Sequence, residues 1–438
     1  MSTLIHRLNH WAKDAPSAAA QKYRTEAGWQ TVTTTEYRDR IFYLALFLES
    51  KGVSRGDVCA ILSYNHMYWV YMDLAPGLVG AVSAGLYPNS NQSDIDYVLG
   101  HTQAKVLTVQ NKDYFAKVVG TKGERSLPSH IKTILVIEGD ATFSPLAVSI
   151  TKAVEEGKRI AQTQNKSLDQ YLSRLKPRDP AFLIFTSGTT GFPKGAMLCH
   201  ENICFTIDAV VKHWKITAKT GSMFSFLPLS HIAEKLQNIG GGISLRYTVH
   251  FCTKFDNVIQ ELGEVQPTVL LCVPRVWEKI MDGVKSKLAK ATGVKKKLAT
   301  WAFAVAERVA DAKYSQKIPN PLDLAQLVIA EKLVLSKIKK ALGLTQVLKS
   351  ASGAAVLGPH IAKWFRNLGI DILECYGQTE STGMICLTEP GVDNLGCVGV
   401  PAPGVEFRIL DDGEVISKGP HIFLGYYKND QATAETLK

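Results

Sequence analysis

The residues best suited to chemistry lie in one short segment, residues 186–195, which reads TSGTTGFPKG. This segment combines four hydroxyl side chains, three glycines, a proline and Lys194. Glycines let a backbone come close to a ligand, while hydroxyls and an ammonium group donate hydrogen bonds to anionic oxygens. The composition therefore indicates a loop that binds a polyphosphate.

Apolar residues flank this loop on both sides, at Ala181 to Phe185 and at Ala196 to Leu198. We expect both flanks to be buried strands that hold the loop between them. A Walker A loop is excluded, because Lys194 follows Pro193 rather than glycine and no Ser or Thr follows the lysine. The remaining alternative is a surface hairpin with a solvated lysine, which the density of donors between two apolar runs disfavours.

A second motif, CYGQTES, occupies residues 375–381 after a predicted strand at Asp371 to Glu374. Tyr376 offers an aromatic face for an adenine ring, Thr379 a hydroxyl for a phosphate oxygen, and Glu380 a carboxylate for a hard cation. Just upstream, residues 348–357 (LKSASGAAVL) predict a strand that ends in small residues, beside which a flat ligand could lie.

These motifs resemble those of the adenylate-forming enzymes, which include acyl-CoA synthetases, luciferases and the adenylation domains of peptide synthetases. The TSGTTG and PKG elements match the phosphate loop of that family, and the SGAA and CYGQTES segments follow in the matching order. The segment VPRVWEKI at residues 273–280 and the helical region after it resemble the long-chain acyl-CoA synthetases. Trp277 within that segment has an equal alternative as a packing anchor for a helix.

The resemblance implies that the protein binds ATP with Mg²⁺ and uses coenzyme A as a co-substrate. It implies catalytic roles for Lys194, Thr379, Glu380 and His231. It implies Mg²⁺ binding by Glu380 and Thr186. It implies nucleotide binding by Thr186, Ser187, Gly188, Thr189, Thr190, Gly191, Lys194, Gly353, Ala354, Glu374, Tyr376, Gly377, Gln378 and Thr379. The family often has an amide-bearing residue near Glu374, where this chain has a carboxylate.

His231 follows a predicted strand at Ser222 to Leu227, in the sequence LPLSHIAEK. A lone histidine is more often a packed or surface residue than a functional one. Ligands of parallel sheets, however, bind beyond the carboxyl ends of the strands. The family resemblance places a residue of this motif at the border of the acyl pocket, so we expect His231 there.

The reaction that the resemblance implies is the activation of a long-chain fatty acid in two steps. ATP first converts the acid to an acyl-adenylate with release of pyrophosphate, and the thiol of coenzyme A then displaces AMP. Relative to the family, the TGD motif, the hinge and the small C-terminal domain are not present in these 438 residues. We therefore expect the large N-terminal domain, poorly active or inactive alone. The alternatives are nucleotide binding without turnover and a ligase for a different carboxylic acid.

The expected fold is α/β, with two doubly wound βα lobes packed together and a small distorted antiparallel β-barrel. Alternating helical and strand patterns up to about residue 175 predict the first lobe. Short β runs broken by Pro and Gly between residues 396 and 428 predict the barrel. The predicted division is an N-terminal lobe at 1–175, a second lobe with the phosphate loop and a basic helical insertion at 176–345, and the adenine motif with the barrel at 346–438.

The charge balance, 50 Lys and Arg against 40 Asp and Glu, gives a net charge of +10 that favours anionic partners. Nucleic acid is excluded, because no zinc spacing, RNP-type motif or basic helix with heptads accompanies this charge. Seven lysines lie between residues 279 and 297, and Lys337, Lys339 and Lys340 follow. Such residues usually form a solvated helix face. The alternative is peripheral contact with anionic membranes, where each basic residue contributes about 1 kcal/mol.

The eight cysteines include no CxxC pair, and several lie in apolar runs, so we expect buried reduced thiols. The first residues lack the apolar core of a secretory signal. The most apolar window, residues 68–87, is interrupted by Asp73 and Pro76, which argues against a membrane span. Together these features predict a reducing cytoplasm as the compartment.

Overall fold

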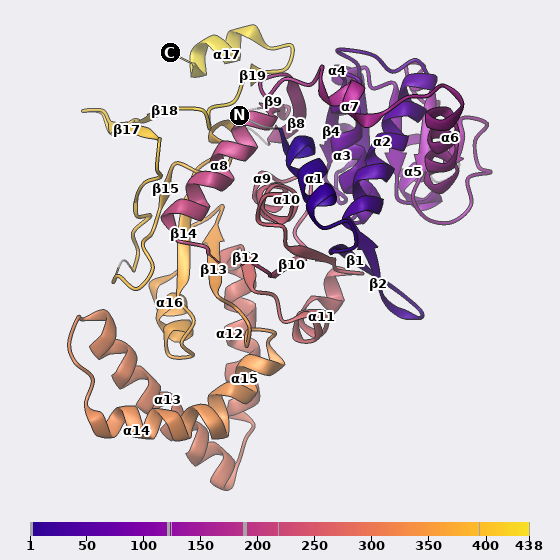
Figure 1. The fold of residues 1–438 in the computed structure, drawn as a ribbon. Coiled ribbons are helices and arrows are strands. Elements are labelled where there is room, and N and C mark those ends of the chain that lie inside the picture. The colour runs from indigo at the N-terminus through magenta and orange to yellow at the C-terminus, as the bar shows by residue number, and fades with distance from the viewer. Residues whose placement is uncertain are drawn as a thin grey trace.

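Figure 1 shows the computed structural model of the chain, which folds around two mixed β-sheets. The structure describes residues 3–120, 123, 125–186, 191–217, 219–393 and 395–437. In the first sheet the strands β8, β4, β3, β5, β6 and β7 are parallel, and β9 and β19 are antiparallel additions at one edge. Its spatial order is β19(Gly425–Tyr426), β9(Lys194–Cys199), β8(Pro180–Thr186), β4(Val82–Leu86), β3(Val58–Leu62), β5(Val106–Val109), β6(Thr133–Val136) and β7(Ala147–Ser149).

Helices cover both faces of this first sheet. In β3, Val58, Ala60 and Leu62 pack with residues of α4 and α5, whereas Cys59 and Ile61 pack with residues of α2 and α3. This alternation is the doubly wound arrangement that the sequence predicts. The helices of this region are α1(Leu4–Asp14), α2(Thr34–Ser50), α3(Met67–Leu78), α4(Gln92–Thr102), α5(Lys112–Val119), α6(Ile150–Thr163) and α7(Leu168–Leu172).

The second sheet is parallel at its centre and antiparallel at both ends. Its spatial order is β16(Val400–Pro401), β15(Cys386–Leu387), β14(Ile372–Tyr376), β13(Lys349–Gly353), β12(Val269–Cys272), β10(Ser222–Ser225), β11(Thr248–Phe251), β1(Ala19–Thr25) and β2(Gly28–Thr33). The mixed α/β class with parallel sheets is therefore confirmed.

Two sets of helices cover the faces of the second sheet. Leu270 and Cys272 of β12 pack with α12 and α16, while Ala351 and Leu373 on neighbouring strands pack on the side of α8. The helices are α8(His200–His213), α9(Ile232–Glu234), π-helix η1(Lys235–Gly241), α10(Gly242–Leu245), 3₁₀-helix η2(Phe255–Asn257), α11(Val258–Val265), α12(Pro274–Ala289), α13(Gly293–Tyr314), α14(Pro321–Ala330), π-helix η3(Glu331–Leu335), α15(Ser336–Ala341), α16(Pro359–Arg366) and 3₁₀-helix η4(Thr379–Ser381).

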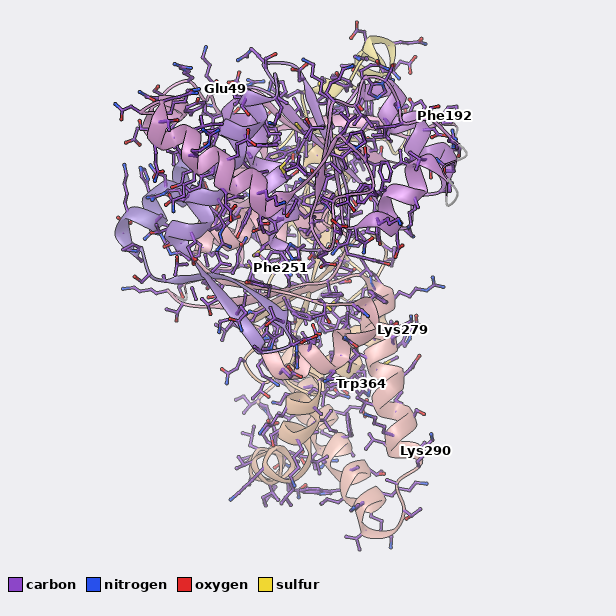
Figure 2. The ribbon with its side chains drawn as sticks, turned by 90° about the vertical axis from the view of Figure 1, so that its right-hand side faces the viewer. Glu49, Phe192, Phe251, Lys279, Lys290 and Trp364 are labelled. Atoms are coloured by element: carbon purple, nitrogen blue, oxygen red, sulfur yellow. The ribbon has the colours of Figure 1, made fainter. Side chains whose placement is uncertain are left out.

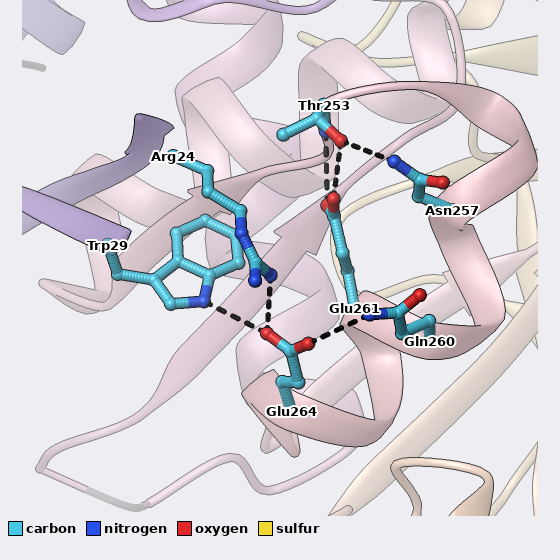
Figure 3. Close-up of polar contacts among 7 residues, drawn as sticks. All are labelled: Arg24, Trp29, Thr253, Asn257, Gln260, Glu261 and Glu264. Carbon is cyan, nitrogen blue, oxygen red and sulfur yellow. Dashed lines mark hydrogen bonds and ion pairs between the residues drawn. The ribbon is translucent and has the colours of Figure 1, made fainter. Parts of the chain in front are cut away.

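The β1–β2 hairpin attaches the N-terminal region to the second sheet. Figure 3 shows how side chains of this hairpin meet α11. An Arg24 guanidinium nitrogen lies 2.5 Å from a carboxylate oxygen of Glu264, and the Trp29 indole nitrogen donates to the same oxygen at 3.4 Å. Conversely, β8 and β9 from the predicted second lobe lie in the first sheet. The sheets thus cross the boundary at residue 175, and the three-part domain division stays a proposal.

The last strands do not close into one barrel. β16 joins the second sheet, β19 joins the first, and β17(Glu406–Ile409) pairs with β18(Val415–Lys418) as a separate hairpin. A barrel needs an inward apolar face, but the residues of β17 and β18 are exposed or half-buried on both faces. Gly404 and Gly413 have φ of +83° and +87°, and redirect the chain between these short strands. The final helix is α17(Asp430–Thr436).

A group of helices projects from the second sheet at the bottom of Figure 1. We call residues 283–341, which run from the end of α12 through α13, α14 and η3 to α15, the helical arm. α13 and α14 form an antiparallel pair, and the arm rests on α16 through Trp364 and its neighbours, as Figure 2 shows. Within the described ranges, no helix has the length and apolar character needed to cross a bilayer.

Candidate functional site

The phosphate loop connects two antiparallel strands. β8 ends at Thr186 and β9 begins at Lys194, and these two residues are directly paired, with the Thr186 hydroxyl 3.5 Å from the Lys194 carbonyl oxygen that it donates to. The loop residues Ser187, Gly188, Thr189 and Thr190 lie outside the described residues. The predicted strands on either side of the loop are thus confirmed, and they bring Thr186 and Lys194 together at its base.

The end of the loop that precedes β9 is held by an aromatic contact with α4. Gly191 has φ of +118°, which L side chains rarely adopt. The next residue, Phe192, stacks on Tyr97 of α4 with ring centroids 4.5 Å apart and planes 6° from parallel. Tyr97 in turn stacks on His101, whose Nε2 lies 2.9 Å from the Tyr427 carbonyl oxygen. An aromatic stack thus links the loop to the chain just after β19.

A cavity of about 490 Å³ lies beside the base of the loop. It is bounded by α8, η1 and the strands β12 to β14 of the second sheet. Nine of the predicted site residues line it: Thr186, Lys194, His231, Gly353, Ala354, Gly377, Gln378, Thr379 and Glu380. Most of the other walls are apolar, and include Ile207, Val210, Trp214, Met223, Leu236, Leu245 and Leu271. The cavity therefore joins a polar end to an apolar interior.

The polar end is organised around Tyr426 of β19. The Tyr426 hydroxyl donates a hydrogen bond of 2.6 Å to Oε1 of Glu380, and the Lys194 ammonium lies 5.1 Å from the centre of its ring. Burial raises the pKa of the Tyr426 phenol, and the hydrogen bond to Glu380 raises it further. The Tyr426 hydroxyl therefore stays protonated and can donate its hydrogen bond to Glu380. The same side chain contacts Glu380 through its hydroxyl and Lys194 through its ring.

Sequence reasoning missed Tyr426. Its place depends on the pairing of β19 with β9, in which Tyr426 lies opposite Ala196, two residues from Lys194 and on the same face of the strand. The local sequence GYYK contains two tyrosines and nothing that distinguishes the first. β19 has only two residues and is too short to be recognised from the sequence alone.

The turn after β14 places Thr379 and Glu380 at the cavity. Gln378 accepts from the Ser381 and Gly383 backbone amides and donates its own amide to the Ser381 hydroxyl at 3.0 Å, which closes η4. A Cβ at Gly377 would lie 2.5 Å from the Met384 backbone nitrogen, so only glycine fits there. The glycine of the CYGQTES motif therefore serves the close approach of two backbone segments.

The floor of the cavity includes the end of β13. A Cβ added to Gly353 would lie 3.1 Å from the Cys375 carbonyl oxygen, and Ala354 has a left-handed φ of +68°. Trp277 supports this strand from behind, because its fully buried indole donates to the Ala351 carbonyl at 3.1 Å and packs edge-on against Phe365. Of the two interpretations of Trp277, the geometry favours the packing anchor.

Among the predicted nucleotide-binding residues that the structure describes, three do not line the cavity: Gly191, Glu374 and Tyr376. The Glu374 carboxylate is buried and accepts a hydrogen bond of 3.4 Å from the Leu357 amide. Burial raises the pKa of Glu374. The Tyr376 side chain is 39% exposed at the end of β14. Roles for these side chains in holding adenine stay predictions.

His231 lies at the cavity with one ring nitrogen already engaged. Its Nδ1 accepts from the Ala233 amide at 3.2 Å and so caps α9. Burial lowers the pKa of His231, so the ring is neutral at neutral pH. A neutral ring that is held in place by this hydrogen bond can border an apolar ligand.

A second polar cluster lies just beneath the cavity, on α9 and η1. The Glu234 carboxylate accepts from the Ser225 hydroxyl at 2.7 Å and from the Asn238 amide at 2.9 Å. Burial raises the pKa of Glu234 to about 8. The neighbouring Lys235 forms a buried ion pair with Asp73 of α3. Glu234, Lys235 and Asp73 are all buried, and each has a protein side chain as its partner.

The described residues contain no group of three or more His, Cys, Asp and Glu side chains able to hold a metal alone. Mg²⁺ is commonly held by one or two carboxylates together with phosphate oxygens and water. Glu380 at the cavity, with Thr186 nearby on the lining, fits such a partly ligand-built site. A protein-only metal cage does not fit the described part of the chain.

Taken with the fold, this geometry defines an α/β protein with a ligand cavity that combines an ammonium, a carboxylate and apolar walls. Residues 8–427 match the AMP-binding enzyme family, and the chain belongs to that family. Over 417 residues it is 31% identical to the long-chain-fatty-acid–CoA ligase ACSBG2 of Homo sapiens, covering 93% of this chain and 61% of that protein. It is 32% identical over 430 residues to the long-chain-fatty-acid–CoA ligase FadD15 of Mycobacterium bovis, covering 97% and 68%.

Among solved structures, the chain resembles the N-terminal domain of FACL13 from Mycobacterium tuberculosis. The TM-score is 0.72 at 15% identity, with 99% of this chain and 94% of that chain covered. This likeness supports the fold. The sequence prediction of an adenylate-forming enzyme fold is therefore confirmed, while the chain spans 61% of the length of its human relative.

Proposed function

We propose that the protein takes part in the ATP-dependent activation of a long-chain fatty acid to an acyl-adenylate and then to acyl-CoA. The observation that carries this proposal is that polar and apolar side chains line the same cavity. The polar set is Lys194, Thr379 and Glu380, and the apolar set includes Ile207 and Val210. A triphosphate needs the first set and an acyl chain needs the second. The names of the relatives at 31% and 32% identity support the same activity.

The first step joins a carboxylate oxygen of the acid to the α-phosphorus of ATP and breaks the bond to pyrophosphate. Catalysis of such a transfer is chiefly positioning and neutralisation of charge. The Lys194 ammonium and the Thr186 hydroxyl, together with Ser187, Thr189 and Thr190 of the loop, would hold the β and γ phosphates. The Thr379 hydroxyl would hold the α-phosphate. In the second step the thiol of coenzyme A displaces AMP from the acyl carbon.

Glu380 and Thr186 would hold Mg²⁺ in this scheme. When bound, the ion neutralises charge on the phosphate oxygens. The protein's own contribution is to fix the carboxylate in place, which Tyr426 does through the 2.6 Å hydrogen bond to Glu380 Oε1. Tyr426 is therefore a positioning residue in the proposal.

The acyl chain would occupy the apolar part of the cavity between α8 and η1. The neutral His231 ring, held by the hydrogen bond that it accepts from the Ala233 amide, would border the carboxylate end. Gly241 allows the wall of η1 to come close to Met223, since a Cβ there would lie 3.2 Å from the methionine Cε. The long-chain preference follows the relatives' names, and a different carboxylic acid is an alternative within the same reaction.

ATP–pyrophosphate exchange, measured with fatty acids from octanoate to stearate, tests this function. We expect exchange that depends on the fatty acid and rises with chain length. A calorimetric titration with a non-hydrolysable palmitoyl-adenylate analogue runs in parallel and reports binding alone. Failure of the analogue to bind would overturn the proposal.

Binding without efficient turnover is the second candidate, because the chain covers 61% of its human relative. Under this candidate the analogue binds and palmitate-dependent exchange stays at the level of the Lys194→Met variant. The two candidates are thus separated by one pair of measurements.

The compartment stays a prediction. The structure records eight free cysteines, of which Cys397 is exposed and Cys375 half-buried while the others are buried. Buried thiols agree with the reducing cytoplasm that the sequence predicts.

A further inference from the structure

The helical arm carries the positive charge of the whole molecule. Residues 283–341 contain 13 Lys and Arg against four Asp and Glu, a net charge of +9. The rest of the chain contains 37 against 36, a net charge of +1. In Figure 2, Lys279 and Lys290 mark the helix α12, which leads downward into this arm. The electrostatic character of the protein is therefore set by one projecting structure.

Each of the four acidic residues of the arm is already in an ion pair. Asp323 pairs with Arg308 at 2.7 Å, and Glu331 pairs with Lys339 at 2.6 Å. Glu307 and Asp311 both pair with Lys363 of α16, at 3.4 and 3.3 Å. No ion pair with a described residue involves the eleven remaining lysines: Lys285, Lys287, Lys290, Lys295, Lys296, Lys297, Lys313, Lys317, Lys332, Lys337 and Lys340.

The same arm exposes large apolar side chains. Ile318 is 94% exposed, Leu322 71% and Val328 69%, and Leu324, Ile329 and Leu333 are also exposed. They lie on α14, on the loop before it and on η3, and not in the contact with α13, which is made by residues such as Leu327 and Ala330. A face this apolar beside so much unpaired charge is unusual for a soluble surface.

We propose that this apolar face of the arm, defined by Ile318, Leu322, Leu324, Val328, Ile329 and Leu333, docks on an anionic lipid bilayer. The apolar side chains would enter the boundary between headgroups and acyl chains. The lysines, on long flexible stems, would reach the anionic headgroups around them. Each lysine near such a surface adds to the attraction, and these contributions fall as the salt concentration rises.

The charge and the position of the arm favour this occupant over others. A second copy would bring a second arm of +9 against the first, and the two would repel. Both described chain ends lie toward the top of Figure 1, away from the arm, so a segment continuing from residue 437 would start far from the apolar face. Nucleic acid would use the lysines and leave the apolar side chains in water.

Sedimentation with lipid vesicles tests the proposal on the whole chain. The vesicles are phosphatidylcholine alone, or phosphatidylcholine with 30% phosphatidylglycerol. We expect about tenfold more bound protein on the anionic vesicles at 0.1 M salt, and a loss of that difference at 0.5 M salt. Equal binding to both vesicles would overturn the proposal.

Two variants separate charge from apolar contact. Lys295→Glu/Lys296→Glu/Lys297→Glu should lower binding to anionic vesicles at least tenfold. The matched control places three charge reversals on exposed α6 residues, Lys152→Glu/Lys158→Glu/Arg159→Glu, and should lower binding less than twofold. An equal loss in the control would mean that net charge alone is responsible, and would overturn the assignment to the arm.

Val328→Ser/Ile329→Ser tests the apolar face itself. We expect about fivefold weaker binding, with far-ultraviolet circular dichroism and analogue binding unchanged because these side chains lie outside the core. The control Ile409→Ser/Ile416→Ser removes exposed apolar residues of β17 and β18 and should have no effect. Loss of membrane binding only in the control would place the membrane contact on β17 and β18 and contradict the proposal. Retention of membrane binding in the arm variant, together with self-association of the wild type, would identify a second copy as the partner of this face and would also contradict the proposal.

Discussion

Two clusters in this protein, one in the core and one at the cavity, each combine a lysine, a carboxylate and an aromatic side chain. They differ in how the charges are compensated. In the core, the Lys235 ammonium contacts Asp73 directly and lies 5.0 Å from the Trp69 ring centre and 4.6 Å from that of Phe182. At the cavity, the Lys194 ammonium lies 5.1 Å from the Tyr426 ring centre, and the Tyr426 hydroxyl bonds Glu380. Each cluster has one lysine, one carboxylate and aromatic rings.

The difference lies in where each charge is compensated. Lys235 and Asp73 are almost fully buried and neutralise one another, so neither has charge left for a ligand. Lys194 and Glu380 are kept apart by a tyrosine, and both line an open cavity. We therefore expect a structural role for the buried Lys235 and a ligand-binding role for Lys194, although their neighbours are similar. Removal of a residue should damage folding in the first cluster and ligand binding in the second.

The largest expected effect is on stability. Asp73→Asn would leave Lys235 as an uncompensated buried charge, and should lower the free energy of unfolding by about 3 kcal/mol or more. Urea denaturation followed by circular dichroism measures this change. The double variant Asp73→Asn/Lys235→Met removes both charges and should recover part of the loss. A single variant that costs less than 1 kcal/mol would show that the pair is not what holds this region.

The second effect is on ligand binding. Lys194→Met keeps the aliphatic stem and removes the ammonium, and should weaken binding of ATP or of the palmitoyl-adenylate analogue about a hundredfold, or about 2.7 kcal/mol. The free energy of unfolding should change by less than 1 kcal/mol, the reverse of Asp73→Asn. Lys132→Met, a matched change at the surface of the first sheet, should leave both quantities unaltered. Unchanged nucleotide binding in Lys194→Met would remove the basis of the site assignment.

These two clusters also show what could be predicted from the sequence. The apolar runs Ala181 to Phe185 and Ala196 to Leu198 lie within β8 and β9, as predicted. Lys194 and Glu380, which both line the cavity, could be predicted as site residues because each lies in a local motif with several unusual residues in a row. Runs and motifs of this kind carry their information within about ten residues.

The parts that could not be predicted depend on pairing over long distances. Tyr426 reaches Glu380 only because β19 joins β9, more than two hundred residues earlier in the chain. The β1–β2 hairpin was missed because its residues alternate irregularly and only a few are buried. The ion pair of Lys235 with Asp73 likewise joins two helices whose packing no local pattern reports.

A third effect, which depends on pH, concerns Glu234, the residue before Lys235 of the buried pair. Its pKa is raised by burial to about 8, whereas an unfolded chain has the ordinary value of 4.5. Between these pH values the unfolded state is ionised and the folded state is neutral, so Glu234 destabilises the fold by about 1.4 kcal/mol for each pH unit. Below pH 4.5 both states are neutral and the effect vanishes.

Glu234→Gln should remove this dependence. The free energy of unfolding of the variant, relative to the wild type, is expected to rise by about 1.4 kcal/mol per pH unit from pH 5 to pH 7.5. Urea denaturation at four pH values measures the slope. Glu49→Gln serves as the control, because hydrogen bonds from Lys166 and Tyr171 outweigh partial burial and lower the pKa of that carboxylate, which is then ionised in both states from pH 5 to pH 7.5 and should give no slope. A flat difference for Glu234→Gln would mean that the carboxylate is ionised in the folded protein.

The smallest expected effect tests the group that separates the cavity charges. Tyr426→Phe removes the hydroxyl that bonds Glu380 and keeps the ring beside Lys194. One hydrogen bond to a charged acceptor contributes about 1.5 kcal/mol, so nucleotide binding should weaken about tenfold. The Mg²⁺ concentration that gives half-maximal binding should rise with it, because the carboxylate is no longer held in one place.

Tyr426→Leu distinguishes the hydroxyl from the ring. If the hydroxyl positions Glu380, the Phe and Leu variants share the increase in the Mg²⁺ requirement, and only Leu alters the salt dependence of ATP binding through Lys194. A different outcome would be that the Tyr426→Phe variant binds Mg²⁺ and nucleotide as the wild type does while the Tyr426→Leu variant does not. In that case only the aromatic ring contributes to binding, and Tyr426 acts through Lys194. The tyrosine would then belong with Trp69 and Phe182 of the core, as a neighbour of a cation and not a partner of a carboxylate.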